Sequence, residues 1–547
     1  MRRFLALWLA AAPALALAAP PAVPLTTLKS VTQELSSDAY AGREPTSPEE
    51  AKTIALIADR FAKAGLKPGN VKVPGGSWYQ DVAMVEITAD PKVVLNFTGG
   101  KAPVSLAYKT DMAAWTWRTV AQSRIAASDV VFVGYGINAP EKGWNDYAGL
   151  DVRGKTVVIL VNDPDWETKT ETGLFGGRRM TYYGRWAYKY EEAARQGAAA
   201  ALIVHDTEPA AYPWGVVVSS WTGPQINQDA ANGHSDQSAA VGWVTQEGAT
   251  RLMAAAGQDW AKLKAAAKVK GFRAVPLGLK LDATLDNSVR RQVSKNVVGI
   301  LPGKTRPDEV VLYTAHWDHL GRCEPVNGDA ICNGAVDNAT GTAGLIALAE
   351  MHGKAGPAAR SQVFLAVTAE ESGLLGSKYY AENPIYPLAK TVGGVNMDGL
   401  NVTGATRDIV ITGRGQSPDL DAMAPRWAAK AKRSVSPETD VEKGYYFRSD
   451  HFSLARLGVP MTAVGSGRTL VVGGAAAGKL AADDYTTNRY HKPQDEYDAT
   501  WNWAGAVQDL TMYYGIGREL AEGNLWPKWS PTAEFRAARE KSMGARK

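Results

Sequence analysis

The sequence predicts an α/β protein with a mixed, mostly parallel sheet flanked by helices, and with a second, β-rich domain inserted into it. Three apolar runs rich in branched side chains are typical of parallel strands buried on both faces, at 310–315, 362–369 and 392–397. Each run leads directly into a histidine or a carboxylate. Because ligands of open α/β sheets bind beyond the carboxyl ends of the strands, we expect these polar side chains to meet at one edge of the sheet.

The N-terminal part of the main domain, residues 19–124, is expected to contain a helix followed by a strand. Ser47, Pro48 and Glu50 form a capping pattern, an apolar stripe follows them, and Gly65 ends the helix. The strand is expected at 78–89.

The inserted domain is expected at 125–275. Its expected elements are three strands and a helix, at 129–137, 155–161, 199–206 and about 185–196. Apolar runs and helices alternate again from residue 295, so residues 276–525 are expected to complete the main domain. The tail, 526–547, is expected to be a charged terminal helix or a frayed end.

The composition is that of a folded soluble protein. The chain has 547 residues, of which 45% are apolar and 21% charged. Its formal charge of +4 is not concentrated in a basic stretch, which argues against a nucleic-acid partner. Nothing in the sequence indicates an oligomeric state.

Residues 1–18 are expected to be a secretory signal. They have a basic start, an apolar stretch and small residues in an Ala-x-Ala arrangement that ends near Ala18. A membrane anchor is the alternative, but the stretch is shorter than the ~20 residues of a spanning helix. No later segment is apolar for long enough to span a bilayer. We therefore expect an exported protein, periplasmic or secreted, without stable membrane insertion.

The chain has two cysteines, Cys323 and Cys332. In an exported protein a disulfide between them is favoured over metal binding. Such a bridge would stiffen the segment between His316 and Asp337.

Five side chains of the kinds that bind zinc follow the strands and loops of the main domain: His316, Asp337, Glu371, Asp398 and His491. His316 and Asp398 can hold one ion, while Glu371 and His491 hold another. Asp337 can bridge the two through its two oxygens. The expected cofactor is therefore two Zn²⁺ per chain, which together acidify a water and stabilise an oxyanion.

The reaction also needs a general base that is not a ligand. Glu370 directly precedes the third candidate ligand, and neighbouring residues of an extended segment point in opposite directions. Asp318, two positions after the first candidate ligand, can accept the second imidazole proton of that ligand. His319 and His352 are expected to be a loop residue and a helix-end residue without a part in the site.

Six blocks of this region resemble the di-zinc exopeptidase family of secreted aminopeptidases and glutamate carboxypeptidases. They are AHWDHLG (315–321), GAVDNATGTAG (334–344), TAEESGLLGSKYY (368–380), NMDGL (396–400), RSDHFSLARLGVP (448–460) and YHKPQDEYD (490–498). The resemblance implies the zinc exopeptidase fold, zinc ligation by the five residues above, orientation by Asp318 and general-base action by Glu370. It also implies that Tyr490 donates a hydrogen bond to the tetrahedral oxyanion.

The inserted domain is similar, more loosely, to the protease-associated (PA) domain. The similarity lies in FVGYGI, DVRGKTVVIL and GAAAALIVHD, and it implies a module that covers part of the cleft. Its loop at 163–184 is then expected to face the peptide. Family members often have two consecutive aspartates, whereas this chain has Asp337 followed by Asn338.

These observations favour a secreted zinc aminopeptidase that acts on peptides. A carboxypeptidase is the first alternative and would need a basic pocket, for which Arg448 is the nearest candidate unless it pairs with Asp450. A glutaminyl cyclase-like enzyme on a one-zinc scaffold is less favoured, because the ligands of both ions are present. A non-catalytic binding protein on the same fold is disfavoured because no ligand is missing.

Overall fold

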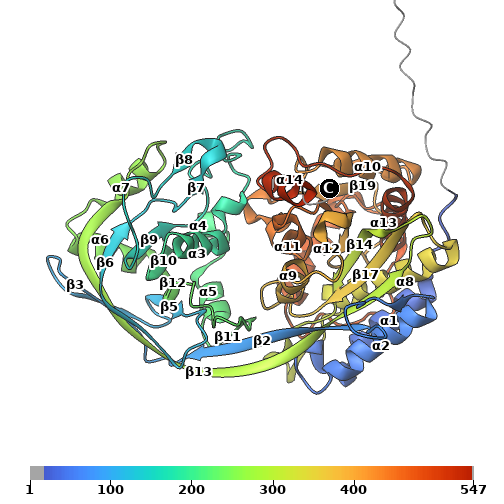
Figure 1. The fold of residues 1–547 in the computed structure, drawn as a ribbon, viewed down its shortest axis with the longest axis horizontal. Coiled ribbons are helices and arrows are strands. Elements are labelled where there is room, and N and C mark those ends of the chain that lie inside the picture. Colours follow the sequence, from blue (N-terminus) through green and yellow to red (C-terminus); the bar gives the residue numbers. More distant parts are fainter. Residues whose placement is uncertain (1–17, 545–547) are drawn as a thin grey trace, which may run out of the picture.

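The computed structural model describes residues 18–544, so the expected secretory signal lies outside the described residues apart from Ala18. The chain folds into two lobes that long strands connect (Figure 1). Strand β13, Val275–Leu301, runs through both lobes. It pairs along its second half with β2, Tyr79–Ala89, so the two strands form the connection between the lobes.

The first lobe contains the expected mixed sheet. Its further strands are β1 (Lys67–Pro68), β11 (Pro224–Gln228), β14 (Arg306–His316), β17 (Arg360–Val367), β18 (Thr391–Met397), β19 (Asp408–Thr412), β20 (Ser434–Val435) and β21 (Met461–Ser466). The central strands β14, β17, β18 and β21 are parallel, while β13 pairs antiparallel with β17. The three apolar runs in the sequence are therefore parallel neighbours, as the fold class predicted.

Helices cover both faces of this sheet. They are α1 (Leu25–Leu35), α2 (Glu50–Lys63), α8 (Gly341–Ala355), α9 (Leu375–Glu382), α10 (Pro418–Lys430), α11 (His451–Arg456), α12 (Gly474–Asp484), α13 (Ala504–Glu522) and α14 (Arg536–Gly544). α1, α2, α8, α10 and α13 share one buried cluster with alternate side chains of β14, whereas α9 and α11 pack with the other set. This two-sided burial explains the uninterrupted apolar runs.

The second lobe has its own sheet around the first half of β13. Its strands are β3 (Val94–Thr98), β4 (Val104–Ala107), β5 (Met112–Trp115), β6 (Gln122–Phe132), β9 (Thr156–Leu160), β10 (Ala200–Val204) and β12 (Ala240–Val244). Its helices are α3 (Trp186–Arg195), α4 (Thr207–Ala210), α5 (Trp214–Trp221), α6 (Gln246–Ala255) and α7 (Trp260–Ala267). A short ribbon, β7 (Asn138–Ala139) with β8 (Trp144–Asn145), completes it.

The lobes divide the chain differently from the expected boundaries of 125 and 275. β3, β4 and β5 lie before residue 125, yet their apolar side chains belong to the core of the second lobe. The alternating apolar residues at the start of β13 belong there too, whereas β11 pairs with β2 in the sheet that joins the lobes. β13 itself belongs to both sheets, since it pairs with β6 in the second lobe and with β2 between the lobes.

The tail packs against the first lobe. Trp529 and Phe535 are buried, and the guanidinium of Arg539 in α14 donates to the carbonyls of Leu388, Thr391 and Val392. Of the two expectations for this segment, the terminal helix is the one observed. Within residues 18–544, no helix is long and apolar enough to cross a membrane.

Candidate metal centre

Asp337 lies between two histidines, one on each of its carboxylate oxygens. Its Oδ1 is 3.4 Å from Nε2 of His316, at the end of β14. Its Oδ2 is 3.3 Å from Nε2 of His491, in the loop before α13. A carboxylate placed in this way can contribute one oxygen to each of two neighbouring cations.

Each histidine also faces a second carboxylate. Asp398 Oδ1, just after β18, is 3.2 Å from Nε2 of His316, and Glu371 Oε2, after β17, is 3.2 Å from Nε2 of His491. The five predicted ligands therefore come together as His316 with Asp398, His491 with Glu371, and Asp337 between the pairs. Two overlapping donor groups lie within 4.8 Å: His316, Asp337 and Glu371, and His316, Glu370 and Asp398.

Asn338 connects the strand ends beneath this site. Its side-chain amide donates to the carbonyls of His316 and Met397, and its Oδ1 accepts from the amides of Gly341 and Gly399. An aspartate could not donate the first two bonds. The substitution of Asn for the more frequent Asp thus has a structural use here.

Asp318 acts mainly on the backbone after β17. The nearest partner of Nδ1 of His316 is the backbone carbonyl of Asp318, at 3.2 Å, while the Asp318 carboxylate is 3.8 Å away. That carboxylate accepts from the amides of Glu370 and Glu371, at 3.1 and 3.3 Å. Asp318 therefore orients the segment that carries a ligand and the candidate base, and its backbone orients the imidazole.

Glu370 and Glu371 lie in a turn, and the expected extended segment is not observed. Ala369 before them has a φ of 52°, and the Glu370 carbonyl accepts from the amides of Gly373 and Leu374. The buried carboxylate of Asp318 holds both amides, which a continuing strand would have paired with a neighbouring strand. The turn still separates the two carboxylates, because Glu371 faces His491 and Glu370 faces the His316 and Asp398 side.

The pKa values reflect a dense group of charges. Burial opposes the imidazolium of His491, but Glu371 and Asp337 outweigh it and raise its pKa to about 10. Burial also opposes the carboxylate of Asp337, yet His316 and His491 hold its pKa well below the usual range. Burial, together with Asp398 and Glu371, raises the pKa of Glu370 well above its usual value. Glu370 is thus the carboxyl in this group most suited to taking up a proton.

His319 belongs to the site, contrary to its expected role as a plain loop residue. It is 1% exposed, and its Nδ1 lies 2.6 Å from Oε1 of Glu371. Its ring also meets the ring of His491 edge to face, at a centroid distance of 5.6 Å. His319 therefore fixes the oxygen of Glu371 that does not face His491. His352, by contrast, is buried under Tyr514 and bonds Gln362, away from the site.

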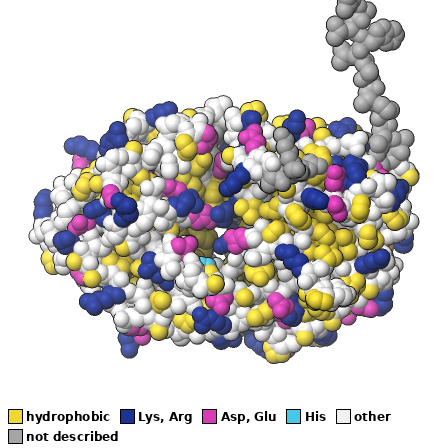
Figure 2. All heavy atoms as spheres, in the orientation of Figure 1, with side chains coloured by type: hydrophobic (Ala, Val, Ile, Leu, Met, Phe, Trp, Pro, Cys, Tyr) yellow, Lys and Arg dark blue, Asp and Glu magenta, His cyan; other side chains and the backbone are white. Residues whose placement is uncertain are grey.

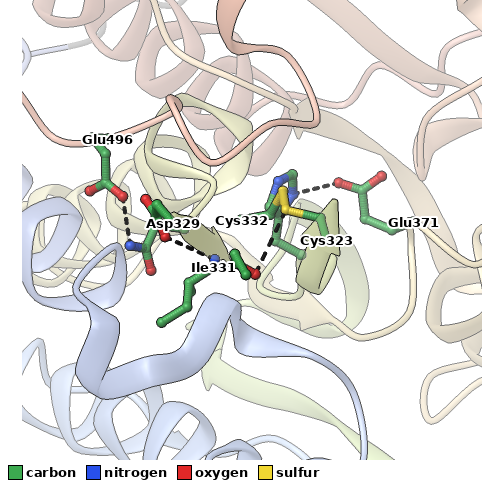
Figure 3. Close-up of a disulfide and its surroundings, with 9 residues drawn as sticks. Cys323, Asp329, Ile331, Cys332, Glu371 and Glu496 are labelled. Atoms are coloured by element: carbon green, nitrogen blue, oxygen red, sulfur yellow. Dashed lines mark hydrogen bonds and ion pairs between the residues drawn. A yellow bond between two sulfur atoms is a disulfide. The ribbon is translucent and has the colours of Figure 1, made fainter. Parts of the chain in front are cut away.

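A disulfide-linked hairpin follows His319 in the chain (Figure 3). Its strands are β15 (Gly321–Val326) and β16 (Asp329–Cys332), and the predicted Cys323–Cys332 bond joins them. The bridge closes a loop within the connection between His316 and Asp337.

Asp495 holds the backbone of the segment that carries the bridging residue, Asp337. It is fully buried and accepts from the backbone amides of Val336 and Asp337, both at 3.0 Å. The hydroxyl of Tyr485 also donates to the carboxylate of Asp495. The block YHKPQDEYD, which carries His491, was the only sequence signal for this residue.

Tyr490 and Arg448 lie at the open side of the centre. Tyr490 is 38% exposed and stacks on His491 at a centroid distance of 3.9 Å. Arg448 is exposed, and its guanidinium lies over the ring of Tyr445. Asp450 is buried, and no ion pair between it and Arg448 is found in residues 18–544. The alternative considered for Arg448, a pairing with Asp450, is thus not observed in the described residues.

Residues 296–515 match the family model described as Peptidase family M28. Aminopeptidase NAALADL1 of Mus musculus is 33% identical over 129 residues, which are 22% of this chain and 16% of that protein. A probable zinc metalloprotease of Pyricularia oryzae is 29% identical over 210 residues, 36% of this chain and 40% of that protein. The matched segments thus span less than half of either relative.

Solved structures align over most of the chain. An aminopeptidase from Aneurinibacillus sp. strain AM-1 covers 92% of this chain and 95% of its own, with a TM-score of 0.49 and 20% identity. BSAP, a zinc aminopeptidase from Bacillus subtilis, covers 93% and 97%, with a TM-score of 0.41 and 18% identity.

Proposed function

We propose that the protein is a zinc-dependent exopeptidase that removes residues from the N-terminus of peptides, because residues 296–515 match the model of Peptidase family M28. The observation that carries the proposal is the position of Asp337, with one oxygen toward His316 and the other toward His491. This arrangement provides ligands for two ions.

The donor set fits zinc. Imidazole nitrogens and carboxylate oxygens are ligands that zinc prefers, and three protein ligands per ion leave a position for water. Nε2 of His491 is buried without a hydrogen-bond partner among the described residues, although two carboxylate oxygens lie 3.2 and 3.3 Å from it. Such an atom, close to acceptors but not aligned with them, is suited to a cation held between the three groups.

The residues around the ions perform the proton transfers and the orientation. Two zinc ions would polarise the scissile carbonyl and lower the pKa of the attacking water. Glu370 takes the proton of that water and delivers it to the leaving amine. Tyr490, stacked on His491, donates its hydroxyl to the developing oxyanion. Asp318 keeps Glu370 in place through the turn amides.

Two carboxylates of the centre are placed to bind the N-terminus of the substrate. Asp398 and Glu370 lie on the side of the centre away from His491, and Asp398 has a partly exposed side chain. A free α-ammonium group can pair with these two carboxylates. We therefore assign the aminopeptidase reaction.

The assay compares an aminoacyl peptide, its N-acetylated form and its C-terminal amide. Cleavage of the free-amine and amidated peptides but not the acetylated one, lost with chelator and restored by zinc, is the expected result. Release of a C-terminal residue from the acetylated peptide would instead support the carboxypeptidase alternative. Arg448, which has no ion pair among the described residues, is the group that would bind the terminal carboxylate in that case.

We also propose export and a cleft-covering role for the second lobe. The disulfide supports an oxidising compartment. The expected peptide-facing loop, 163–184, contacts the first lobe: Arg179 pairs with Glu438, and Met180 donates its amide to Val441. Figure 2 shows a hollow between the lobes with acidic side chains around it. Fractionation of cells that express the full chain tests export, and a panel of peptides of increasing length tests the second lobe.

A further inference from the structure

Arg43 is a buried arginine far from the candidate ligands in sequence. It ends the short helical segment η1, Asp38–Arg43, and its side chain is fully buried. Within residues 18–544, its guanidinium makes four hydrogen bonds, and all four go to backbone carbonyls, those of Leu35, Trp317, Asn333 and Gly334. A buried guanidinium that bonds only carbonyls acts as a connector of backbone segments.

Three of these carbonyls lie at the two ends of one loop, residues 317–334. Nε donates to Trp317 at 2.8 Å, and the two terminal nitrogens donate to Asn333 and Gly334 at 2.7 and 2.8 Å. The loop begins directly after the ligand His316 and ends three residues before the ligand Asp337. The fork of Arg43 therefore holds together the points where the loop leaves and rejoins the metal centre.

The backbone around Arg43 reinforces this connection. The carbonyl of Arg43 accepts from the amide of His319, the residue that fixes Glu371. Gly42, with a φ of 69°, is so close to the hairpin that a Cβ there would lie 2.5 Å from the carbonyl oxygen of Gly321. The disulfide closes the same loop further out, between Cys323 and Cys332.

We propose that Arg43 is a positioning residue of the metal centre, which closes the base of the loop and thereby sets the separation of His316, His319 and Asp337. The inference rests on the proposed function for the identity of the ion. It assigns to an N-terminal residue, outside the matched family region, a part in forming the site.

The positive charge of Arg43 would weaken metal binding, whereas its hydrogen bonds to the loop would strengthen it. Burial lowers its pKa to about 10, and the neighbouring Asp318, Asp495 and Asp337 favour the charged form, so it is a cation at neutral pH. A cation near the centre repels a metal ion. Loss of the charge alone would therefore tighten metal binding, whereas loss of the hydrogen bonds to the two ends of the loop 317–334 would weaken it. The sign of the effect separates the two roles.

The test compares Arg43→Lys, Arg43→Met and a matched control, Arg433→Lys. Arg433 is also buried and donates to Asp408, Thr406, Ser466 and Asp509, none of which is a predicted ligand. Two quantities are measured in full-length protein: zinc affinity by competition with a chelator, and hydrogen exchange of peptides covering 317–337 in the metal-free protein.

We expect Arg43→Lys and Arg43→Met to weaken zinc binding by about 10- to 100-fold, the usual effect of losing a group that orients ligands. Exchange in 317–337 should become faster on the order of tenfold, and Arg433→Lys should change neither quantity beyond its general loss of stability. Unchanged exchange and affinity in Arg43→Lys, or tighter zinc binding in Arg43→Met, would overturn the proposal.

A double variant, Cys323→Ser with Cys332→Ser, keeps the test decisive if the Arg43 variants do not fold. Because Arg43 still joins the two ends of the loop in this double variant, the zinc affinity of the variant should stay within about threefold of the wild type. A loss of 100-fold would assign the positioning to the disulfide and reject the role of Arg43. If the wild type binds no zinc, the proposed function fails, while the exchange measurement still decides the role of Arg43.

Discussion

Replacement of His319 provides a sharp test of the site, because this residue contacts a ligand without being one. In His319→Ala, the buried Oε1 of Glu371 loses a partner at 2.6 Å. A hydrogen bond to a charged group is worth about 1.5–3 kcal/mol, and each 1.4 kcal/mol is tenfold in affinity. Zinc affinity should therefore fall about 10- to 100-fold, while Glu371 itself remains.

His352→Ala is the matched control. His352 is also fully buried, has one side-chain partner, Gln362, and stacks on an aromatic ring. Both variants leave a cavity that costs about 2–5 kcal/mol of folding free energy, measured by denaturant unfolding. Zinc competition titrations should then separate them, and His319→Asn, whose side-chain amide can donate in place of Nδ1, should recover part of the affinity. Equal losses of affinity in the two alanine variants would refute the reasoning.

Three further predictions concern the same centre. Glu370→Gln should lower kcat by about 10²- to 10⁴-fold with zinc content unchanged, since an amide cannot accept the proton; undiminished turnover would reject the assigned base. The pKa of His491 is raised from 6.5 to about 10 in the metal-free protein, so its stabilising charge is fully present below pH 6.5 and is lost as the pH rises through 10. Zinc must displace that proton, so its apparent affinity should rise about tenfold per pH unit between pH 7 and 9, and a flat profile in titrations would contradict this. Zinc at 100 times the Kd of each site should stabilise the protein by about 2.7 kcal/mol per bound ion in thermal unfolding, an effect that chelator reverses; an unchanged Tm would count against a site formed by folding.

The sheet could be predicted because its central strands are buried on both faces. An uninterrupted apolar run such as 310–315 is typical of a strand buried on both faces. His316 directly after it indicated that the carboxyl end of β14 lies at the site. The first half of β13 alternates apolar and polar residues, but the middle, 286–294, is mostly polar, with Val289 and Val293 as its apolar residues, where the strand crosses between the lobes. A strand shared by two sheets carries no single pattern, so the boundary expected at 275 does not separate the two lobes. The boundary expected at 125 is too late because β3, β4 and β5 pack in the second lobe.

Site residues that follow strands could be predicted from the sequence. Residues whose role depends on contacts between distant segments could not. His316 and Asp398 needed only strand ends and ligand chemistry, whereas the bridging Asp337 lies before α8 and was assigned from ligand chemistry. His319 lies one position after Asp318, and no pattern distinguishes it from a solvent-exposed loop histidine. Arg43 gave no signal either, because a guanidinium that bonds carbonyls depends on segments far apart in the chain.

Anomalous diffraction from crystals grown with zinc tests the central claim most directly. We predict two zinc peaks about 3.5–4 Å apart, bridged by Asp337, with His316 and Asp398 at one and Glu371 and His491 at the other. A single peak, or two peaks that do not share Asp337, would contradict the account.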